Sequence, residues 1–466
     1  MTAEELKSKI TDYGALVQEL QSQKGADTST EALKQYDPLQ HSVLDKSLRP
    51  DKLYTNERNE QVTAAVNRLA LPLQKQIVQR AAAFLCGRPI TLVAEPADEK
   101  QKQLLAAVRH LWDDNKLDYR SKRLAKIMMG ETECAEIWYP EPLESGDPYW
   151  EDLLGAGAKF RLRMRIVSPG LGDRLYPLFA PTGDMVGFGR GYLLEKAGST
   201  EKEERFDLYT DAAIYTGAKD SGKWVVTTTA NPFKKIPIIY YQQAKPEWAD
   251  VQTLIERLEN QLSNHADTND YFGSPILVVM GNIVSFSKKG ESGKVMEIEP
   301  GASINYATWQ QAPESVKLEI ENLIRFIFSG TDTPNISFEE MKSLGTYSGI
   351  ALKMLFMAAH MKAADKEEIF GECIQRRINF FKSAIGVLDV SFEKVRLTIK
   401  PKFEYFLPKD DRETVEILGS AITSKILSRE TAVNLNPLVQ NSVAELDRIK
   451  SESEEYASSA LDDLVA

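Results

Sequence analysis

Apolar side chains recur with helical spacing in two stretches of the chain, residues 247–272 and 313–329. In each stretch they fall three or four positions apart, with charged or polar side chains between them, which predicts two amphipathic helices with narrow apolar stripes. We expect the stripes to pack the helices together through Val251, Leu254, Ile255, Leu258, Leu262, Val316, Ile320, Leu323, Ile324 and Ile327. Leu318, Phe326 and Phe328 are expected to widen the second stripe.

Between these helices, short apolar runs are separated by glycine, proline and charged residues. Runs of this length that are bounded by glycine fit strands better than helices, so the pattern predicts a small β-rich insert. The expected strands are Pro275–Met280, Val284–Phe286, Val295–Ile298 and Ile304–Tyr306.

A polar segment with glycines at its borders follows the second helix. Gly330, Gly345 and Gly349 are expected to supply backbone freedom, and Pro334 prevents a helix from continuing through the segment. A helical pattern then resumes for roughly forty residues, which corresponds to a helix of about 60 Å. The whole stretch therefore predicts two rod-like helices, or rods, with a β-rich insert at their tip, followed by a movable loop and a long helix. We find no pattern of catalytic residues in it.

Helical and strand-like patterns are both found in the rest of the chain, so the predicted fold class is α+β. Helices are expected at Gln61–Leu85 and Glu99–Ile137, after a helical or mobile lead-in over Leu6–Leu39. Alternation with a period of two predicts a strand at Phe160–Ile166. Further strands are expected at Gly187–Leu194, Glu204–Tyr209, Ala213–Thr216, Trp224–Thr229 and Ile236–Tyr241. The alternating segment Val395–Tyr405 is expected to return to this sheet, because alone it would expose an apolar face. Residues 409–466 are expected to be helical and acidic, and Ser442–Glu445 matches the capping box at a helix start.

Composition fits a folded protein with substantial cores: 466 residues, of which 42% are hydrophobic and 27% charged. No signal-peptide pattern and no run of about 20 apolar residues is found, so we expect a soluble protein without a membrane partner. The formal charge is −11, and no strong basic tract is present. Tight DNA binding normally requires such a tract, whereas an acidic wall would let DNA slide past it.

Candidate chemistry is weak throughout. Three cysteines and four histidines lack the spacing of a disulfide framework or a zinc site, so no catalytic residue, metal or cofactor is expected. The segment Gly217–Trp224 resembles a phosphate-binding loop, but Trp224 stands where that motif needs a hydroxyl, and a hairpin turn is favoured. Arg161, Arg163 and Arg165 line one side of a predicted strand; a phosphate site is the alternative to the favoured solvated sheet face.

Four blocks, in order along the chain, carry a family resemblance. The first is Arg80–Ile90, a helix that ends in a Gly-x-Pro step, and the second is Asn231–Tyr240, just before the first rod. The third, Ser348–Lys353, follows the glycine-bounded loop, and the last combines Ile426–Thr431 with Pro437 and Glu445–Ile449. In this order and spacing the blocks resemble the portal proteins of tailed bacteriophages, specifically the siphophage family typified by the SPP1 portal.

The resemblance implies a ring of twelve subunits at one capsid vertex, with each part of the chain in a known role. The implied parts are an N-terminal segment of unclear role (1–55), the wing (56–246), two stem helices (247–272 and 313–329), a clip (273–312), a tunnel loop (330–348), a long helix with returning wing strands (349–408) and a helical crown with a tail (409–466). Tunnel-loop residues facing DNA would be Thr331, Asp332, Asn335, Glu339, Glu340, Met341, Lys342 and Ser343. Clip residues docking partners would be Ser287, Lys288, Lys289, Glu291 and Lys294.

The partners that the resemblance implies are further copies of the chain and double-stranded DNA, which passes through without sequence-specific binding. It also implies the large terminase subunit, the major capsid protein, the scaffold and the head-completion adaptor proteins. The expected location is the virion, at the capsid vertex, with assembly in the host cytoplasm. Two alternatives remain: a nucleotide-driven motor subunit, and a monomeric or low-order adaptor or scaffold protein of virion assembly.

Overall fold

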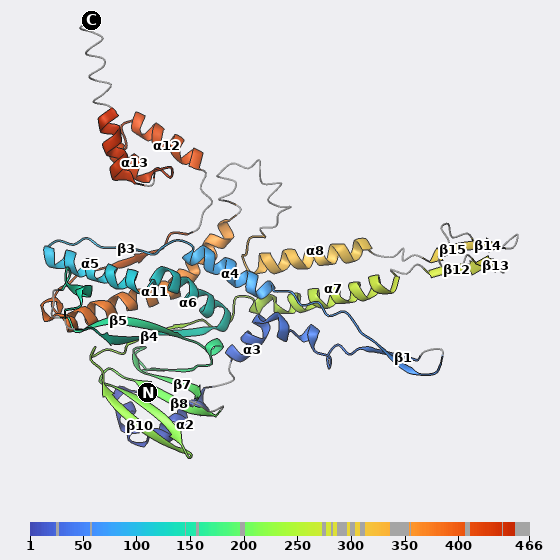
Figure 1. Cartoon of the computed structure of the whole chain (residues 1–466), viewed down its shortest axis with the longest axis horizontal. Helices are drawn as coiled ribbons and strands as arrows, with labels where there is room; N and C mark the ends of the chain where they lie inside the picture. Colours follow the sequence, from blue (N-terminus) through green and yellow to red (C-terminus); the bar gives the residue numbers. More distant parts are fainter. Residues whose placement is uncertain are drawn as a thin grey trace, which may run out of the picture. The chain divides into compact units, whose positions relative to one another are not determined.

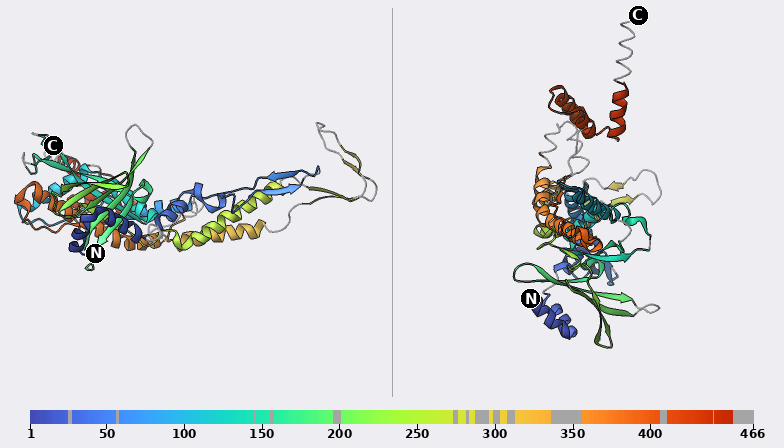
Figure 2. Two further views of the ribbon diagram at one scale, coloured as in Figure 1. Left: turned by 90° about the horizontal axis from the view of Figure 1, so that it is seen from below. Right: turned by 90° about the vertical axis from the view of Figure 1, so that its left-hand side faces the viewer.

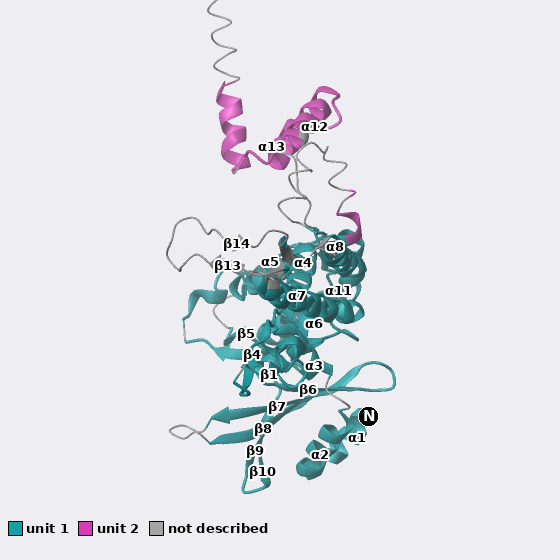
Figure 3. Ribbon diagram, turned by 90° about the vertical axis from the view of Figure 1, so that its right-hand side faces the viewer, with its two compact units in different colours: residues 1–335, 359–405 teal, residues 336–358, 406–466 magenta. Residues whose placement is uncertain are grey.

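The computed structural model describes residues 1–24, 28–55, 58–144, 146–154, 158–195, 201–272, 276–280, 283–286, 296–298, 303–307, 313–335, 354, 356–405, 411–439 and 441–452. The chain forms two compact units, coloured separately in Figure 3. The larger unit comprises Met1–Asn335 and Ala359–Tyr405, and the smaller comprises Ile336–Ala358 and Phe406–Ala466.

The centre of the larger unit is a three-stranded antiparallel sheet in the order β11-β4-β5. Its strands are β4 (Glu133–Pro142), β5 (Phe160–Val167) and β11 (Ile238–Gln242). Because side chains alternate along a strand, β4 buries both faces: Cys134 and Trp138 join the main core, while Ala135 and Ile137 join a second cluster. Because both of its faces are buried, β4 is the strand that contributes to both cores of the unit.

Helices cover one face of this sheet, and Figure 1 shows α5, α6 and α11 on the same side of β4 and β5. The helices of this layer are α3 (Thr28–Tyr36), α4 (Leu73–Cys86), α5 (Glu99–Asp114), α6 (Leu117–Glu131) and α11 (Met357–Leu388). Beside them, the short strands β3 (Thr91–Val93) and β16 (Lys400–Lys402) pair antiparallel.

The other face packs on a five-stranded antiparallel sheet in the order β10-β9-β8-β7-β6. Its strands are β6 (Arg174–Phe179), β7 (Met185–Glu195), β8 (Lys202–Tyr209), β9 (Ala213–Asp220) and β10 (Lys223–Ala230). The N-terminal helices α1 (Ala3–Lys9) and α2 (Tyr13–Gln23) pack on it around Leu16, Val17 and Phe206 (Figure 3). The N-terminal segment, which sequence alone left without a place, therefore completes the core of this sheet.

Two long helices, α7 (Gln252–Phe272) and α8 (Pro313–Gly330), lie side by side (Figure 1, Figure 2). Strands β12 (Ile276–Met280) and β15 (Ser303–Ala307) pair antiparallel, as do β13 (Ile283–Phe286) and β14 (Met296–Ile298). The predicted helix–insert–helix pattern is confirmed at the level of these elements. A hairpin of β1 (Lys52–Thr55) and β2 (Gln61–Ala64) precedes α4.

Short 3₁₀ turns connect several elements: Ile10–Asp12, Pro38–Gln40, Ser42–Leu44, Pro148–Trp150, Pro169–Leu171, Ala249–Val251 and Val390–Phe392. The smaller unit contains α12 (Asp411–Thr423), α13 (Arg429–Leu435) and a helix over residues 442–452. The last helix begins at Ser442, so the predicted helix start is confirmed. Its cap is Asn441, whose Oδ1 accepts from Ala444 N at 3.1 Å, so the prediction that Ser442 opens a capping box is wrong. No described helix is long and apolar enough to span a membrane.

Two of the predicted helices were wrong in extent. The helix expected over Gln61–Leu85 begins only at Leu73, because Pro72 precedes it and residues 61–64 pair with β1 instead. The helix expected over Glu99–Ile137 is broken at Lys116 and ends at Glu131, since Lys116 (φ 53°) and Thr132 (φ 72°) take left-handed conformations. Residues 133–137 then become the central strand β4.

Other expectations were met only in part. Segment 395–405 does return to the larger unit, but only residues 400–402 form a strand, and they pair with β3 rather than with the predicted sheet. Leu318 and Phe326 do not widen the apolar stripe of α8, since they are 59% and 51% exposed; Phe328 does, at 7%.

Candidate functional site

The apolar stripes of α7 and α8 meet as their spacing predicts. Ile255, Leu258 and Ile327 are fully buried in the main core, and Leu254, Leu262, Ile320 and Ile324 pack against them. Near the base of the pair, Gly330 approaches the 3₁₀ turn that precedes α7 so closely that a Cβ would lie 3.0 Å from Val251 Cγ1. Gly330 therefore permits close helix packing, which is a different role from the backbone freedom predicted for it.

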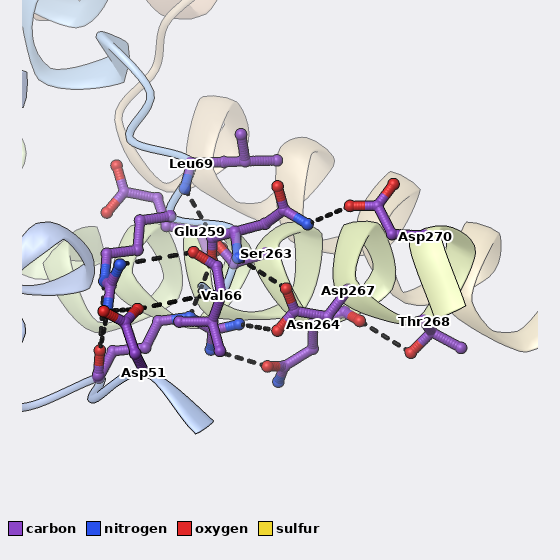
Figure 4. A network of polar contacts seen from close by, with 12 residues as sticks. Asp51, Val66, Leu69, Glu259, Ser263, Asn264, Asp267, Thr268 and Asp270 are labelled. Atoms are coloured by element: carbon purple, nitrogen blue, oxygen red, sulfur yellow. Dashed lines mark hydrogen bonds and ion pairs between the residues drawn. The ribbon is translucent and has the colours of Figure 1, made fainter. Parts of the chain in front are cut away.

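The N-terminal segment from His41 to Leu71 runs along the other side of α7, and Figure 4 shows the polar network between them. Main-chain N–H groups of this segment donate to side chains of α7: Asn67 N to Asp267 (2.6 Å), Leu69 N to Ser263 (2.9 Å) and Leu71 N to Glu259 (2.8 Å). Since α7 supplies the acceptors, it fixes this segment through polar side chains rather than through a second apolar stripe.

Two cations of the same segment complete the network. Arg49 donates to Asn264 and Asp267, each at 2.8 Å. His41 lies 2.7 Å from Glu259 Oε1 through Nδ1, and its Nε2 lies 2.8 Å from the Gln35 carbonyl. Burial lowers the pKa of His41, but the Glu259 carboxylate and the Gln35 carbonyl outweigh it, so this pKa lies above its ordinary value.

The chain leaves α8 through a tight C-terminal cap. Thr333 N donates to Phe328 O (2.9 Å) and Asp332 N to Ser329 O (3.2 Å), with Asp332 left-handed at φ 48°. This pair of bonds is the Schellman motif, with aspartate in place of the usual glycine, and Pro334 follows where a helix cannot continue. Thr331, only 4% exposed, donates its hydroxyl back to Ile327 O at 2.9 Å.

This cap is tied to two other helices by cations that bind main-chain carbonyl groups. Lys362 of α11 donates to Thr331 O at 2.8 Å, and Arg80 of α4 donates to Pro334 O at 2.8 Å. The Arg80 guanidinium also lies over the Phe328 ring, 4.9 Å from its centroid. The exit from α8 is thus fixed to both the helix layer and the long helix α11.

A buried carboxylate, Glu247, holds the lysines of α11 in place. Its side chain is 3% exposed and lies 2.8 Å from Lys362 Nζ and 2.6 Å from Lys366 Nζ. Burial raises the pKa of Glu247, but the two ammonium groups lower it more, so the pKa lies below its ordinary value and the carboxylate stays charged. We call Arg80, Glu247, Lys362 and Lys366 the loop anchor, because they surround the point where the chain leaves α8.

The helix that carries these lysines is itself locked to the central sheet. Arg377 of α11 and Glu136 of β4 form an ion pair in which both side chains are completely buried, with Nε 3.0 Å from each carboxylate oxygen. Arg377 also donates to Ser121 at 2.9 Å, and Tyr241 donates its hydroxyl to Glu136 at 2.5 Å. Four side chains from four elements thus hold α11 on the sheet.

A family model described as phage portal protein, SPP1 Gp6-like, matches residues 28–459. The chain belongs to this portal protein family. It is 24% identical over 420 residues to the portal protein of Bacillus phage SPP1, a match that covers 85% of this chain and 78% of that protein. The family resemblance of the four sequence blocks is therefore confirmed.

Solved structures with partial similarity come from the neck of a gene transfer agent particle. A chain from the neck of the empty particle, computed with C6 symmetry, is 11% identical with a TM-score of 0.42, covering 78% of this chain and 88% of that chain. A chain from the neck of the native particle, computed with C12 symmetry, has the same identity and coverage and a TM-score of 0.40.

In this portal-family chain, nine of the ten predicted stem residues belong to the contact around the main core, while Val316 is half-buried and lies outside it. The predicted loop residues are only partly described. Thr331 is buried, Asp332 is exposed and Asn335 is half-buried at the start of the loop. Residues 339–343 of the predicted tunnel loop and the predicted clip residues 287–289, 291 and 294 lie outside the described part of the chain. Their roles stay predictions.

Sequence inspection missed the residues that hold the loop. Lys362 and Lys366 are four residues apart on one helix face, and this spacing could have suggested a shared acidic partner. Glu247 and Arg377 gave no local signal, because their partners are more than a hundred residues away along the chain.

The two motifs that were considered as phosphate sites form ordinary secondary structure. Ser221 and Gly222 form the two-residue turn between β9 and β10, so Trp224 lies in a strand and the hairpin interpretation is confirmed. Arg161 and Arg163 pair with Glu141 at 2.6 and 2.7 Å, which lowers the pKa of Glu141 to about 2 and fits the solvated sheet face. Among the described residues, no three His, Cys, Asp or Glu side chains are placed to hold a metal ion.

Proposed function

We propose that this chain is the portal subunit of a tailed bacteriophage, that twelve copies form a ring at one capsid vertex, and that the ring is the channel for genome packaging and ejection. The observation that carries the proposal is the portal family match over residues 28–459. The role is structural and has no catalytic step. The site of action is the virion, and assembly takes place in the host cytoplasm.

Within the ring, α7 and α8 are the stem, and residues 273–312 are the clip that meets the large terminase subunit and later the head-completion proteins. The layers around β4, including the returning segment near β16, are the wing, and residues 409–466 are the crown. The major capsid protein and the scaffold contact the outside of the ring. The buried apolar contact between α7 and α8 supports the stem assignment, because it holds the two helices together as one rod while the segment His41–Leu71 covers the polar side of α7.

Residues 330–348 are the tunnel loop, and the loop anchor is its fixed end. Arg80 and Lys362 hold the carbonyls of Pro334 and Thr331, so the start of this segment is fixed to α4 and α11. DNA passes without sequence-specific contacts, and a chain of net charge −11 favours sliding over binding, because duplex DNA carries one negative charge per ~1.7 Å.

The test is a deletion of Glu339–Gly345 in the full chain, followed by electron microscopy of purified particles and a DNA-packaging assay. We expect top views to show rings with the parent number of subunits, while packaging of DNA is impaired. A matched control replaces the same seven residues by glycine and serine, which keeps the length of the loop and removes its chemistry.

Normal packaging by the deletion variant would refute the tunnel-loop assignment. Small monodisperse particles from the parent chain, unchanged by concentration or salt, would instead favour the adaptor alternative. If the glycine–serine variant packages normally and the deletion variant does not, the loop acts by its length alone.

A further inference from the structure

The two edges of the five-stranded sheet differ in how they are protected. At the β6 edge, Pro177 lacks an N–H, the register shifts between Leu178 and Phe179, and the N-terminal ammonium group donates to Phe179 O at 3.3 Å. These are ordinary devices that keep an edge strand from pairing with another chain. At the β10 edge, the pairing with β9 is continuous over eight residues, and no described strand pairs with the other side.

The sequence of β10 contains none of the usual protective residues. It reads Lys-Trp-Val-Val-Thr-Thr-Thr-Ala, with no proline and with no charge after Lys223. β-branched residues dominate it, and Val225 is 60% exposed. A strand of this length and composition, with one edge left unpaired by the described strands, is a ready template for a further strand.

The hairpin geometry indicates which groups of β10 are free. Ser221 and Gly222 both have positive φ (47° and 83°), as in a type I′ turn, which closes on a hydrogen-bonded pair, Asp220 with Lys223. Because bonded and non-bonded pairs alternate in an antiparallel ladder, the N–H and C=O groups of Trp224, Val226 and Thr228 point away from β9. These groups form the unpaired row at the edge.

A groove of about 710 Å³ lies along the same strand. It is lined on one side by Trp224, Val226 and Thr228, and on the other by Ile10, Tyr13 and Gly14, where α2 begins; Figure 3 shows α2 beside this end of the sheet. The walls are held firmly, because Tyr13 donates its hydroxyl to Phe206 O at 2.6 Å and its ring meets the Trp224 ring edge-on at 6.0 Å. The groove therefore has walls of fixed side chains and lies beside the free edge.

A free strand edge with a helix-walled groove beside it is the arrangement by which proteins capture extended peptides: the edge supplies main-chain hydrogen bonds and the groove accepts alternate side chains. We propose that β10 and this groove dock an extended segment of another protein, added as an antiparallel sixth strand, with apolar side chains at alternate positions. The strand offers eight residues, or about 27 Å, of pairing length.

Charge at one end of the groove specifies the segment further. Lys223 is exposed and has no ion-pair partner among the described residues, and Asp12, which also lines the groove, is engaged in capping α2 at Ala15 N (3.1 Å). An antiparallel segment ends beside Lys223, so its C-terminal end carries a carboxylate. This docking site is independent of the portal assignment, since it requires neither a ring nor DNA.

The probe is a fluorescein-labelled nonapeptide of alternating threonine and valine that ends in two glutamates, titrated with the full chain and followed by fluorescence anisotropy. We expect saturable binding that Thr228→Pro weakens at least tenfold, because proline removes an outward N–H without touching the ladder to β9. Thr228→Val keeps that N–H and should bind within twofold of the parent. Lys223→Glu should weaken binding about threefold, as expected for an exposed ion pair.

Hydrogen exchange supplies a second readout if Thr228→Pro disturbs the strand. Bound peptide should slow exchange at the amides of Trp224, Val226 and Thr228, and should leave those of Val225 and Thr227, already paired with β9, unchanged. Absence of saturable binding, or equal binding by Thr228→Pro, would overturn the proposal. Self-association of the parent that Thr228→Pro abolishes would overturn it too, by assigning the edge to a second copy of this chain.

Discussion

Two buried carboxylates join distant segments of this chain, and they differ in the cation that each one faces. Glu136 meets Arg377, with both side chains fully buried, and joins α11 to the central sheet. Glu259 meets His41, with side chains 1% and 3% exposed, and joins the N-terminal segment to α7. Guanidinium stays charged at any physiological pH, whereas imidazole loses its proton within that range.

The Glu136–Arg377 pair keeps its cation at physiological pH, whereas the Glu259–His41 pair depends on pH. Arg377 holds the long helix in the same way under all conditions in which the chain is folded. His41 faces two acceptors, Glu259 and the Gln35 carbonyl, so its ring satisfies both only as the doubly protonated cation. The cation of the Arg377–Glu136 pair therefore keeps its charge near neutral pH, whereas the contact between residues 41–71 and α7, which we call the seam, depends on pH.

Removing Arg377 should give the largest effect. Arg377→Ala leaves Glu136 charged and buried without its partner, and we expect a loss of about 3–5 kcal/mol in the free energy of unfolding. Urea denaturation of the purified chain measures it. A double variant, Arg377→Met with Glu136→Leu, removes both charges and should recover most of the loss; a double variant as unstable as the single one would show that the packing of Arg377, rather than its charge, matters.

The seam along α7 should open as pH rises. Because the folded pKa of His41 is raised, its contribution is complete below the ordinary histidine pKa of about 6.5 and is lost as pH rises through the folded value. Hydrogen exchange at the amides of Asn67, Leu69 and Leu71, which donate to α7, reports the opening. Their protection should fall with rising pH after correction for intrinsic exchange rates.

Glu259→Gln is the matched control for this seam. It removes the charge that favours protonated His41 and should cost about 1.5–3 kcal/mol locally, the range for a hydrogen bond to a charged group. Exchange at the same three amides should become faster at low pH and nearly independent of pH. A pH dependence that survives Glu259→Gln would place the titrating group elsewhere.

The smallest effect is expected on the surface of the helix pair. Arg257 and Glu319 join α7 to α8 at 2.7 Å, but their side chains are 56% and 36% exposed. Arg257→Ala should change the free energy of unfolding by less than about 1 kcal/mol. Salt at about 0.5 M should abolish the difference between the variant and the parent, because it screens exposed charges. A larger cost would mean that this pair is shielded from solvent in the assembled protein.

Sequence patterns predicted the fold where one local signal dominated. The stripes of α7 and α8 and the alternation in β5 were sufficient because burial follows the periodicity of a single element. Residues 61–72 were misassigned because Val62, Val66 and Leu69 imitate helical spacing, while Pro72 and pairing with β1 decide the outcome. Leu318 and Phe326 fit the stripe of α8 by spacing alone, yet they are exposed.

The site was less predictable, because its decisive contacts join residues far apart along the chain. Lys362 with Glu247 and Arg377 with Glu136 become visible only after the long helix is placed. The cap of α8 is different: Thr331, Asp332, Thr333 and Pro334 form a recognisable termination signal, with Asp332 able to take the left-handed position. A closer inspection of that tetrapeptide would have located the fixed end of the loop.

The loop anchor has a consequence for how such chains can diverge. Arg80 and Lys362 bind main-chain carbonyls of Pro334 and Thr331, not their side chains. A carbonyl is present whatever residue occupies the position, so the attachment tolerates substitution beyond it. The two cation–carbonyl hydrogen bonds of the anchor therefore do not depend on which side chain stands at position 331 or 334.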